Sequence, residues 1–185
     1  MALGNVFMTD TDGNIGSQIV NLTEKVCGFL FDISAHENFW TKGAGLAMAE
    51  TWKDNVVELN SLDDATKAGI IPRSGEEDEG ESTDLLAGIP YYHIKQFFGF
   101  AGGSGRLFVM FADCSQNWNA IIDMQKASGG IINQFGVWTE QNLWKKMDDL
   151  AEGYTISIVG DLQSVAEQMA NDYFAPAHIL LAANS

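Results

Sequence analysis

Four apolar runs in the second half of the chain begin about every 24 residues, and the stretches between them have the periodicity of a helix. The runs are Arg106–Ala112, Ile131–Trp138, Tyr154–Val159 and His178–Ala182. This spacing leaves room for one crossover helix between consecutive strands, which parallel strands of one sheet require. Because a run such as Leu107–Phe111 is apolar on both faces, helices should cover both sides of the sheet. We therefore predict an α/β fold with a mostly parallel sheet and right-handed crossovers.

Each of the first three runs is followed by a pattern that favours a helix. We expect helices over residues 116–128, 140–151 and 161–173, where apolar residues recur three or four positions apart. Ser115 and Thr139 stand just before the first two patterns, and hydroxyl side chains there can accept a hydrogen bond from a free backbone N–H. Strand and helix should therefore alternate as far as the last run.

The first half of the chain is less regular. Val26–Ile33 is a strong strand candidate, and Phe39–Lys53 mixes glycine with helix-forming residues, so we expect one broken helix there. Ser61 begins a capping-box pattern before a short helix that should end at Gly69. Pro90 should sit in the first turn of a further helix, where its missing N–H costs nothing.

The N-terminal residues 1–25 form a separate arm or hairpin in this interpretation, ahead of an α/β domain over residues 26–185. A weakly alternating segment precedes a polar cluster that favours a turn, and Ile15–Val20 is a possible return strand. The alternating segment consists of Leu3, Gly4, Asn5, Val6, Phe7 and Met8.

An acidic loop should interrupt the α/β domain at residues 73–84, which read RSGEEDEGESTD and contain no apolar residue. Such a segment cannot bury a core and should be mobile. The whole chain carries 25 Asp and Glu against 10 Lys and Arg, for a formal net charge of −15. A surface of this charge repels phosphate backbones, so we expect no nucleic-acid partner.

The first residues lack the basic and apolar regions of a secretory signal, and no run reaches the length of a membrane-spanning helix. The two cysteines, Cys27 and Cys114, lie within or beside apolar runs and are expected to be buried thiols. We therefore expect the chain to be cytoplasmic where it is made, without direct membrane insertion.

Familiar catalytic and metal-binding patterns are incomplete in this sequence. Asp10–Asn14 begins like a calcium loop, but Ile15 occupies the position that needs glycine and Asn21 the position that needs glutamate. Gly102–Gly105 precedes a strand, whereas glycine-rich nucleotide loops follow one. The three histidines are scattered, and no Gly-x-Ser-x-Gly pattern occurs. We expect no enzymatic activity, no catalytic residue, no cofactor and no metal.

One alternative concerns the carboxyl ends of the parallel strands, where ligands bind in open α/β sheets. Asp113, Glu140 and Asp161 should lie at that edge and could line a small-ligand site, either of a binding protein or of an enzyme. The same residue types are also favoured as helix caps, so the pattern leaves both readings open.

Six stretches of the chain resemble a bacterial family of prophage-type contractile tail sheath proteins, long known only as a domain of unknown function. They are Ala2–Asp12, Thr51–Asp64, Gly88–His93, Gly103–Asp113, Phe135–Trp144 and Ala177–Ser185. The resemblance runs along nearly the whole chain and rests on general pattern rather than on a catalytic motif.

This resemblance implies a structural subunit of a phage tail or a phage-derived injection device, whose copies assemble as stacked rings around an inner tube protein. It implies homo-oligomers held together by terminal arms that add strands to neighbouring sheets, with Leu3–Met8 as the candidate inter-subunit strand. The assembled protein would then reside in the virion or tail particle. Sheath proteins are usually longer, so we expect this chain to be a fragment of a longer one.

Overall fold

The computed structural model describes most of the chain from Val26 onward. The described residues are 26–36, 38–41, 43–72, 83–101, 105–141, 144–146 and 155–183. The predicted strand Leu3–Met8, the N-terminal arm and residues 73–82 of the acidic loop lie outside them.

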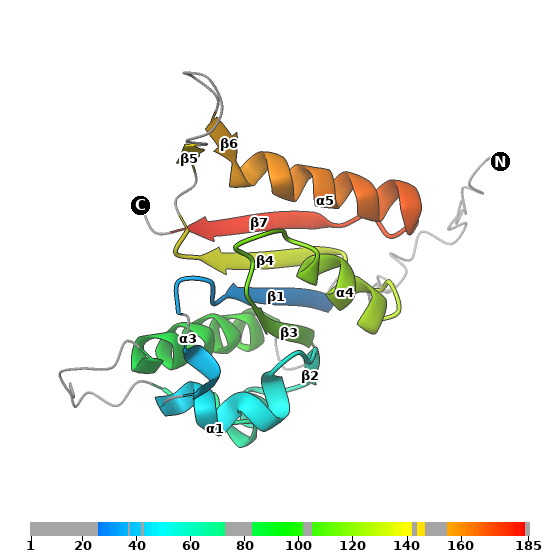
Figure 1. The fold of residues 1–185 in the computed structure, drawn as a ribbon. Coiled ribbons are helices and arrows are strands. Elements are labelled where there is room, and N and C mark those ends of the chain that lie inside the picture. The colour runs from blue at the N-terminus through cyan, green and yellow to red at the C-terminus, as the bar shows by residue number, and fades with distance from the viewer. Residues whose placement is uncertain are drawn as a thin grey trace, which may run out of the picture.

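The main sheet has five strands in the order β2-β3-β1-β4-β7, four of them parallel and β2 antiparallel to β3 (Figure 1). The strands are β1 (Val26–Asp32), β2 (Val57–Leu59), β3 (Arg106–Ala112), β4 (Gln134–Thr139) and β7 (His178–Ala183). The predicted α/β fold with a mostly parallel sheet is confirmed. The longest apolar runs form its centre, as strands covered on both faces require.

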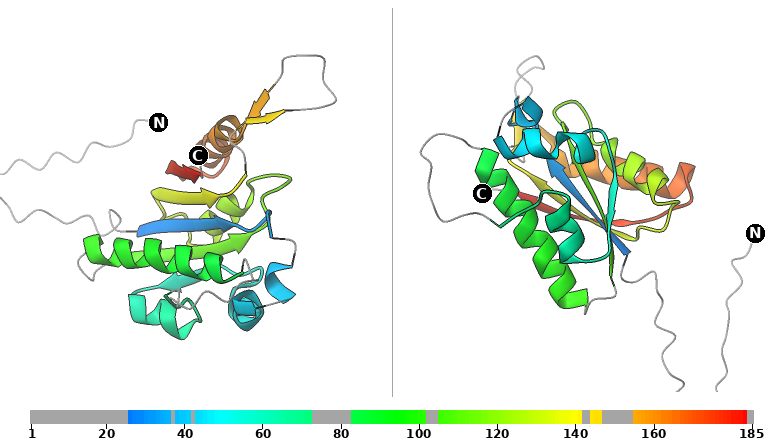
Figure 2. Two further views of the ribbon diagram at one scale, coloured as in Figure 1. Left: turned by 90° about the vertical axis from the view of Figure 1, so that its left-hand side faces the viewer. Right: turned by 90° about the horizontal axis from the view of Figure 1, so that it is seen from below.

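Helices cover the sheet on opposite sides (Figure 2). A short 3-10 helix, η2 (Phe39–Thr41), leads into three helices on one face, which are α1 (Gly43–Trp52), α2 (Leu62–Lys67) and α3 (Thr83–Ala101). The other face carries α4 (Ala120–Ala127) and α5 (Ile158–Asp172). Alternate strand residues therefore enter different cores, and Phe31 packs with the first group while Leu30 packs with the second.

Several local predictions are confirmed. Residues 39–53 form the expected broken helix, since η2 is followed by α1. Ser61 caps α2 by accepting a 3.1 Å hydrogen bond from the Asp64 N–H, and Gly69 follows the helix end with φ +95°. Gly129 and Gly130 also have positive φ after α4, which is the conformation that glycine adopts most readily.

The segment after β4 departs from the prediction. Residues 144–146, expected in a helix, form strand β5 (Trp144–Lys146), which pairs antiparallel with β6 (Thr155–Ser157) in a separate two-stranded sheet. The predicted strand Tyr154–Val159 thus contributes three residues and does not join the main sheet. Ile158 already belongs to α5, because it lies one turn before Leu162 and extends the buried stripe of that helix.

Two helix starts also differ from the prediction. Pro90 is inside α3 rather than in its first turn, because the helix begins at Thr83. Thr83 and Asp84 consequently belong to this helix rather than to the acidic loop. Helix α4 starts late, with Asn119 at its N-cap position in place of Ser115.

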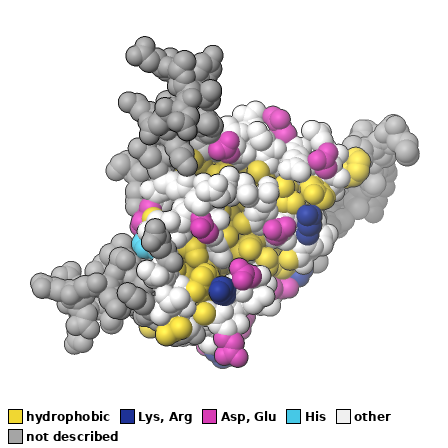
Figure 3. Space-filling view, viewed as in Figure 1, with side chains coloured by type: hydrophobic (Ala, Val, Ile, Leu, Met, Phe, Trp, Pro, Cys, Tyr) yellow, Lys and Arg dark blue, Asp and Glu magenta, His cyan; other side chains and the backbone are white. Residues whose placement is uncertain are grey.

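Asp and Glu outnumber Lys and Arg among the described residues. On the face seen in Figure 3, Asp and Glu side chains are scattered around apolar patches and outnumber Lys and Arg. Among the described residues, no helix is both long enough and apolar enough to cross a membrane.

Candidate functional site

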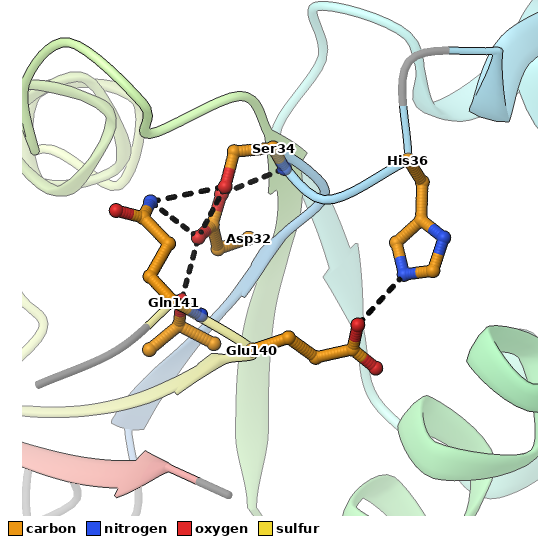
Figure 4. A network of polar contacts seen from close by, with 6 residues as sticks. Asp32, Ser34, His36, Glu140 and Gln141 are labelled. Carbon is orange, nitrogen blue, oxygen red and sulfur yellow. Dashed lines mark hydrogen bonds and ion pairs between the residues drawn. The ribbon is translucent and has the colours of Figure 1, made fainter.

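A buried carboxylate joins the carboxyl ends of three parallel strands. Asp32, at the end of β1, is 1% exposed. Its Oδ1 accepts hydrogen bonds from the backbone N–H groups of Ser34 at 2.9 Å and Cys114 at 3.0 Å. Its Oδ2 accepts hydrogen bonds from the Ser34 and Thr139 hydroxyls and from the Gln141 amide, at 2.9, 2.6 and 2.7 Å (Figure 4).

These five hydrogen bonds saturate the acceptor sites of the Asp32 carboxylate. A buried charge is tolerated when hydrogen bonds replace its water, and charge-assisted bonds are the strong ones. The donors are Thr139 at the end of β4 and residues that follow β1, β3 and β4, so Asp32 holds the ends of these three strands together. Thr139 also accepts a hydrogen bond from the Gln141 N–H at 2.9 Å, which replaces the predicted cap of a long helix.

This network occupies the topological switch point of the sheet. The chain leaves β1 towards β3 on one side and leaves β4 towards β7 on the other, so the switch lies between β1 and β4. Open α/β sheets bind their ligands outside the strand ends at such a point. In this protein the polar side chains at the switch point form hydrogen bonds with one another.

A histidine and a glutamate lie beside the network. The Nε2 atom of His36 is 3.2 Å from Glu140 Oε2, close enough for an ion pair when the imidazole is protonated (Figure 4). The two groups are not aligned as in a hydrogen bond. The buried Nε2 atom of His36 therefore has no hydrogen-bond partner among the described residues. The pair links the loop after β1 to the residue after β4.

The three carboxylates predicted for a ligand site have three different surroundings. Asp113 is exposed, and its Oδ1 accepts a hydrogen bond from the Ser115 N–H at 2.9 Å, which holds the pKa of this carboxyl below its usual range. Glu140 faces His36. Asp161 is exposed on the first turn of α5 and lines a crevice that neither of the other two reaches.

That crevice has a volume of about 420 Å³ and lies between the loop after β3 and the start of α5. Its polar lining consists mainly of amide and hydroxyl side chains, among them Ser115, Asn117, Gln141, Ser164 and Gln168. Among the described residues that line it, Asp161 is the one carboxylate and none is Lys or Arg. The size lies within the range of small-molecule sites.

The cysteines are buried, as predicted. Burial raises the pKa of the Cys114 thiol far above its ordinary value, and the nearby carboxylates of Asp32 and Asp113 raise it further. Burial also raises the pKa of Cys27. A nucleophilic cysteine needs the opposite shift, so both thiols act as small apolar side chains. Among the described residues, no group of three or more His, Cys, Asp and Glu could hold a metal ion.

A different kind of site lies at the edge of the sheet. Strand β7 pairs with β4 on one side, and no described strand pairs with its other side. Its residues, HILLAA, include no proline and no Lys, Asp or Glu, the residues that usually protect an exposed edge. Ile179 and Leu181 pack towards α5, whereas Leu180, on the opposite face, is 57% exposed.

An apolar pocket of about 210 Å³ adjoins this exposed face of β7. Its lining includes Phe29, Phe31, His93, Trp138, Leu180 and Ala182. The Phe29 ring lies across Gly136, where a Cβ atom would come within 2.9 Å of it. Burial lowers the pKa of His93, so its imidazole is neutral at pH 7 and suits apolar surroundings.

Sequence reasoning missed Asp32, Ser34 and Gln141. An aspartate that closes the apolar run Val26–Asp32 was a usable signal, because its place at a strand end points to the edge where polar groups gather. The β7 edge was missed as well, since strand order decides which strand has a free side.

Comparison of the chain with protein-family models, with curated proteins and with solved structures finds no match.

Proposed function

We propose that this chain is a structural subunit of a contractile tail sheath, which assembles into stacked rings around an inner tube protein. The observation that carries the proposal is the unprotected edge of β7, with an apolar pocket directly beside it. An exposed, uncharged edge offers free backbone N–H and C=O groups to a strand from another chain. The resemblance of six sequence stretches to sheath proteins adds support from an independent direction.

The strand that such an edge would accept is Leu3–Met8 of a neighbouring copy. Residues 9–25 separate this segment from β1, and 17 extended residues span at most roughly 55 Å. That reach is enough to cross from one small domain to the next.

The hydrogen-bond network around Asp32, at the carboxyl ends of β1, β3 and β4, also supports a structural role. The Asp32 carboxylate is fully hydrogen-bonded and both thiols are buried, so these groups stabilise the sheet that must carry load between neighbouring subunits. In this proposal the protein is cytoplasmic when made and part of a tail particle when assembled.

Negative-stain electron microscopy of the purified protein, expressed with any residues that follow Ser185 in its gene, tests the proposal. We expect striated tubes or stacked rings, and we expect their loss when residues 1–8 are deleted. Dispersed particles at every protein and salt concentration would contradict the sheath function.

The crevice at Asp161 favours a second candidate, a small-ligand-binding α/β protein. The described part of its lining is rich in amides and hydroxyls, with a single carboxylate and no basic residue, and suits an uncharged ligand rich in hydroxyl groups. A thermal-shift screen of sugars and polyols tests this candidate. A stabilising compound whose effect disappears in Asp161→Ala would favour it over the sheath function.

A further inference from the structure

An exposed phenylalanine stands in a strained backbone conformation at the turn between α5 and β7. Phe174 is 87% exposed and has φ +53°. This left-handed region costs most residues roughly 1–2 kcal/mol and is normally filled by glycine or asparagine after a helix. The only other described non-glycine residue with positive φ is Asp54, whose side chain type tolerates it.

The surrounding structure holds this turn firmly in place. The Ala175 N–H donates a hydrogen bond to the Met169 carbonyl at 3.1 Å. The buried Gln125 donates through its Nε2 to the Ala175 carbonyl at 3.3 Å and to the Ile132 carbonyl at 2.8 Å. Next to Phe174, the Tyr173 ring lies under the Lys126 ammonium at 5.0 Å.

Phe174 therefore carries two costs, backbone strain and an apolar ring that is 87% exposed. Strained residues persist where the surroundings over-determine them and are typical of functional positions. An aromatic ring presented on a rigid turn has the properties of an anchor residue in a protein interface.

The same molecule has an aromatic-lined pocket at a different place. The turn between α5 and β7 lies at the amino end of this strand (Figure 1). The pocket is lined by Leu180, Leu181 and Ala182, which follow Phe174 by six to eight positions. A projecting ring and a pocket on different parts of one surface make a head-to-tail contact between copies. After each such contact, one copy still offers its phenylalanine and the other its pocket. The contact can therefore repeat, and the copies form closed rings or filaments.

We propose that Phe174 of one copy docks into the apolar pocket between α3 and β7 of the next copy. The inference rests on the proposed function, because it names the contact that joins subunits, and it is independent of the strand Leu3–Met8. The ring of Phe174 packs against Phe29, Trp138 and Leu180, and the neutral His93 leaves the pocket uncharged.

The substitution Phe174→Gly separates this role from a role in folding. Glycine relieves the strain at positive φ, so the melting temperature should rise by roughly 2–4 °C. Self-association, measured by analytical ultracentrifugation, should weaken by at least about tenfold, which corresponds to about 1.4 kcal/mol. Phe100→Ala is the matched control, because Phe100 is equally exposed at 88% and should leave association unchanged.

Cross-linking tests the geometry of the contact. Asp172→Cys and Ala182→Cys proteins are mixed and treated with a short bismaleimide, and both native cysteines are buried. We expect a cross-linked dimer in the mixture and none in either protein alone, as a head-to-tail contact requires. Adding Phe174→Gly to the Asp172→Cys protein should abolish the product, whereas adding Phe100→Ala should not.

The outcomes separate this inference from the proposed function. Tubes or rings that persist in Phe174→Gly, with no cross-link in the mixture, would overturn the inference and leave the sheath function standing. A lower melting temperature in Phe174→Gly, without a change in association, would show that the ring is covered by its own chain and would overturn the inference. A wild-type protein that never self-associates would overturn both.

Discussion

The Thr139 hydroxyl donates a 2.6 Å hydrogen bond to the Asp32 carboxylate, and this contact joins the ends of β1 and β4 across 107 positions of sequence. Both side chains are almost completely buried, at 0% and 1% exposure. The ends of the central strands are therefore held together by hydrogen bonds to one buried carboxylate.

Removal of this carboxylate should destabilise the protein strongly. Asp32→Ala would leave buried donors from Ser34, Cys114, Thr139 and Gln141 without an acceptor, each at a desolvation cost. We expect the free energy of unfolding to fall by about 3 kcal/mol or more, measured by urea denaturation.

Asp113→Ala is the matched control for that experiment. Asp113 also follows a parallel strand and also accepts a hydrogen bond from a backbone N–H, but it is exposed. The loss should stay below about 1 kcal/mol. Equal losses in the two variants would show that burial of the Asp32 network is not what stabilises the strand ends.

Two helical glycines should respond in opposite directions to alanine. At Gly45 in α1, an added Cβ would lie 1.8 Å from the Phe39 carbonyl oxygen, so backbone must move and stability should drop by about 2 kcal/mol or more. At Gly99 in α3, no described residue beyond its own turn of helix comes within 4 Å of the added Cβ, and alanine should stabilise the helix by about 0.5–1 kcal/mol.

Thermal unfolding of both variants measures this contrast. A stabilised Gly45→Ala would mean that η2 does not approach α1 as closely as the structure shows. A destabilised Gly99→Ala would mean that another part of the chain or another molecule contacts that position.

Some of the structural features behind these predictions could be predicted from the sequence alone, and others could not. The capping pattern at Ser61 and the apolar run of β3 are local signals, and both elements formed where the pattern placed them. Gln141 could not be assigned, because its role depends on the pairing of β4 with β1. The failure at residues 144–146 has the same cause, since pairing with residues 155–157 overrides a helical pattern.

The candidate site shows the same division. The carboxyl edge was predicted from the strand–helix order, but the side chains that meet there were not. Asp113 bonds to Ser115 and Glu140 faces His36, whereas Asp161 follows β6, which lies outside the main sheet. Phe174 gave no signal either. An aromatic residue after a helix looks like core until its backbone conformation and exposure are known.

His93 should make the protein less stable in mild acid. Burial lowers its pKa below the ordinary value of 6.5, so the unfolded chain binds more protons than the folded one as the pH falls through that range. Stability contributed by the neutral imidazole is thus present above pH 6.5 and is lost towards the lowered folded-state pKa. Urea denaturation between pH 5 and pH 8 measures the slope.

His93→Phe removes this titration and should flatten the slope, with His178→Gln as the control because that side chain is exposed. An unchanged slope in His93→Phe would assign the acid sensitivity to other groups. Because His93 is only partly buried, we expect a modest change rather than acid unfolding.

The edge of β7 should tolerate a charge in the folded monomer but not in an assembly. Leu180 is 57% exposed, so Leu180→Lys should change the free energy of unfolding by no more than about 0.5 kcal/mol. A lysine there places an uncompensated charge beside the pocket and the free strand edge, which is how natural edge strands avoid pairing. Sedimentation and electron microscopy should therefore show fewer and shorter assemblies.

Leu46→Lys is the control, because Leu46 is also 57% exposed but lies on α1, away from β7. Both variants remove one exposed leucine and add one positive charge, so any general effect of lowering the net charge of −15 should be common to them. A difference confined to Leu180→Lys would locate the assembly contact at the free edge of the sheet. Equal assembly in the two variants would show that β7 is not part of the interface. Other surfaces would then have to join the subunits of a sheath.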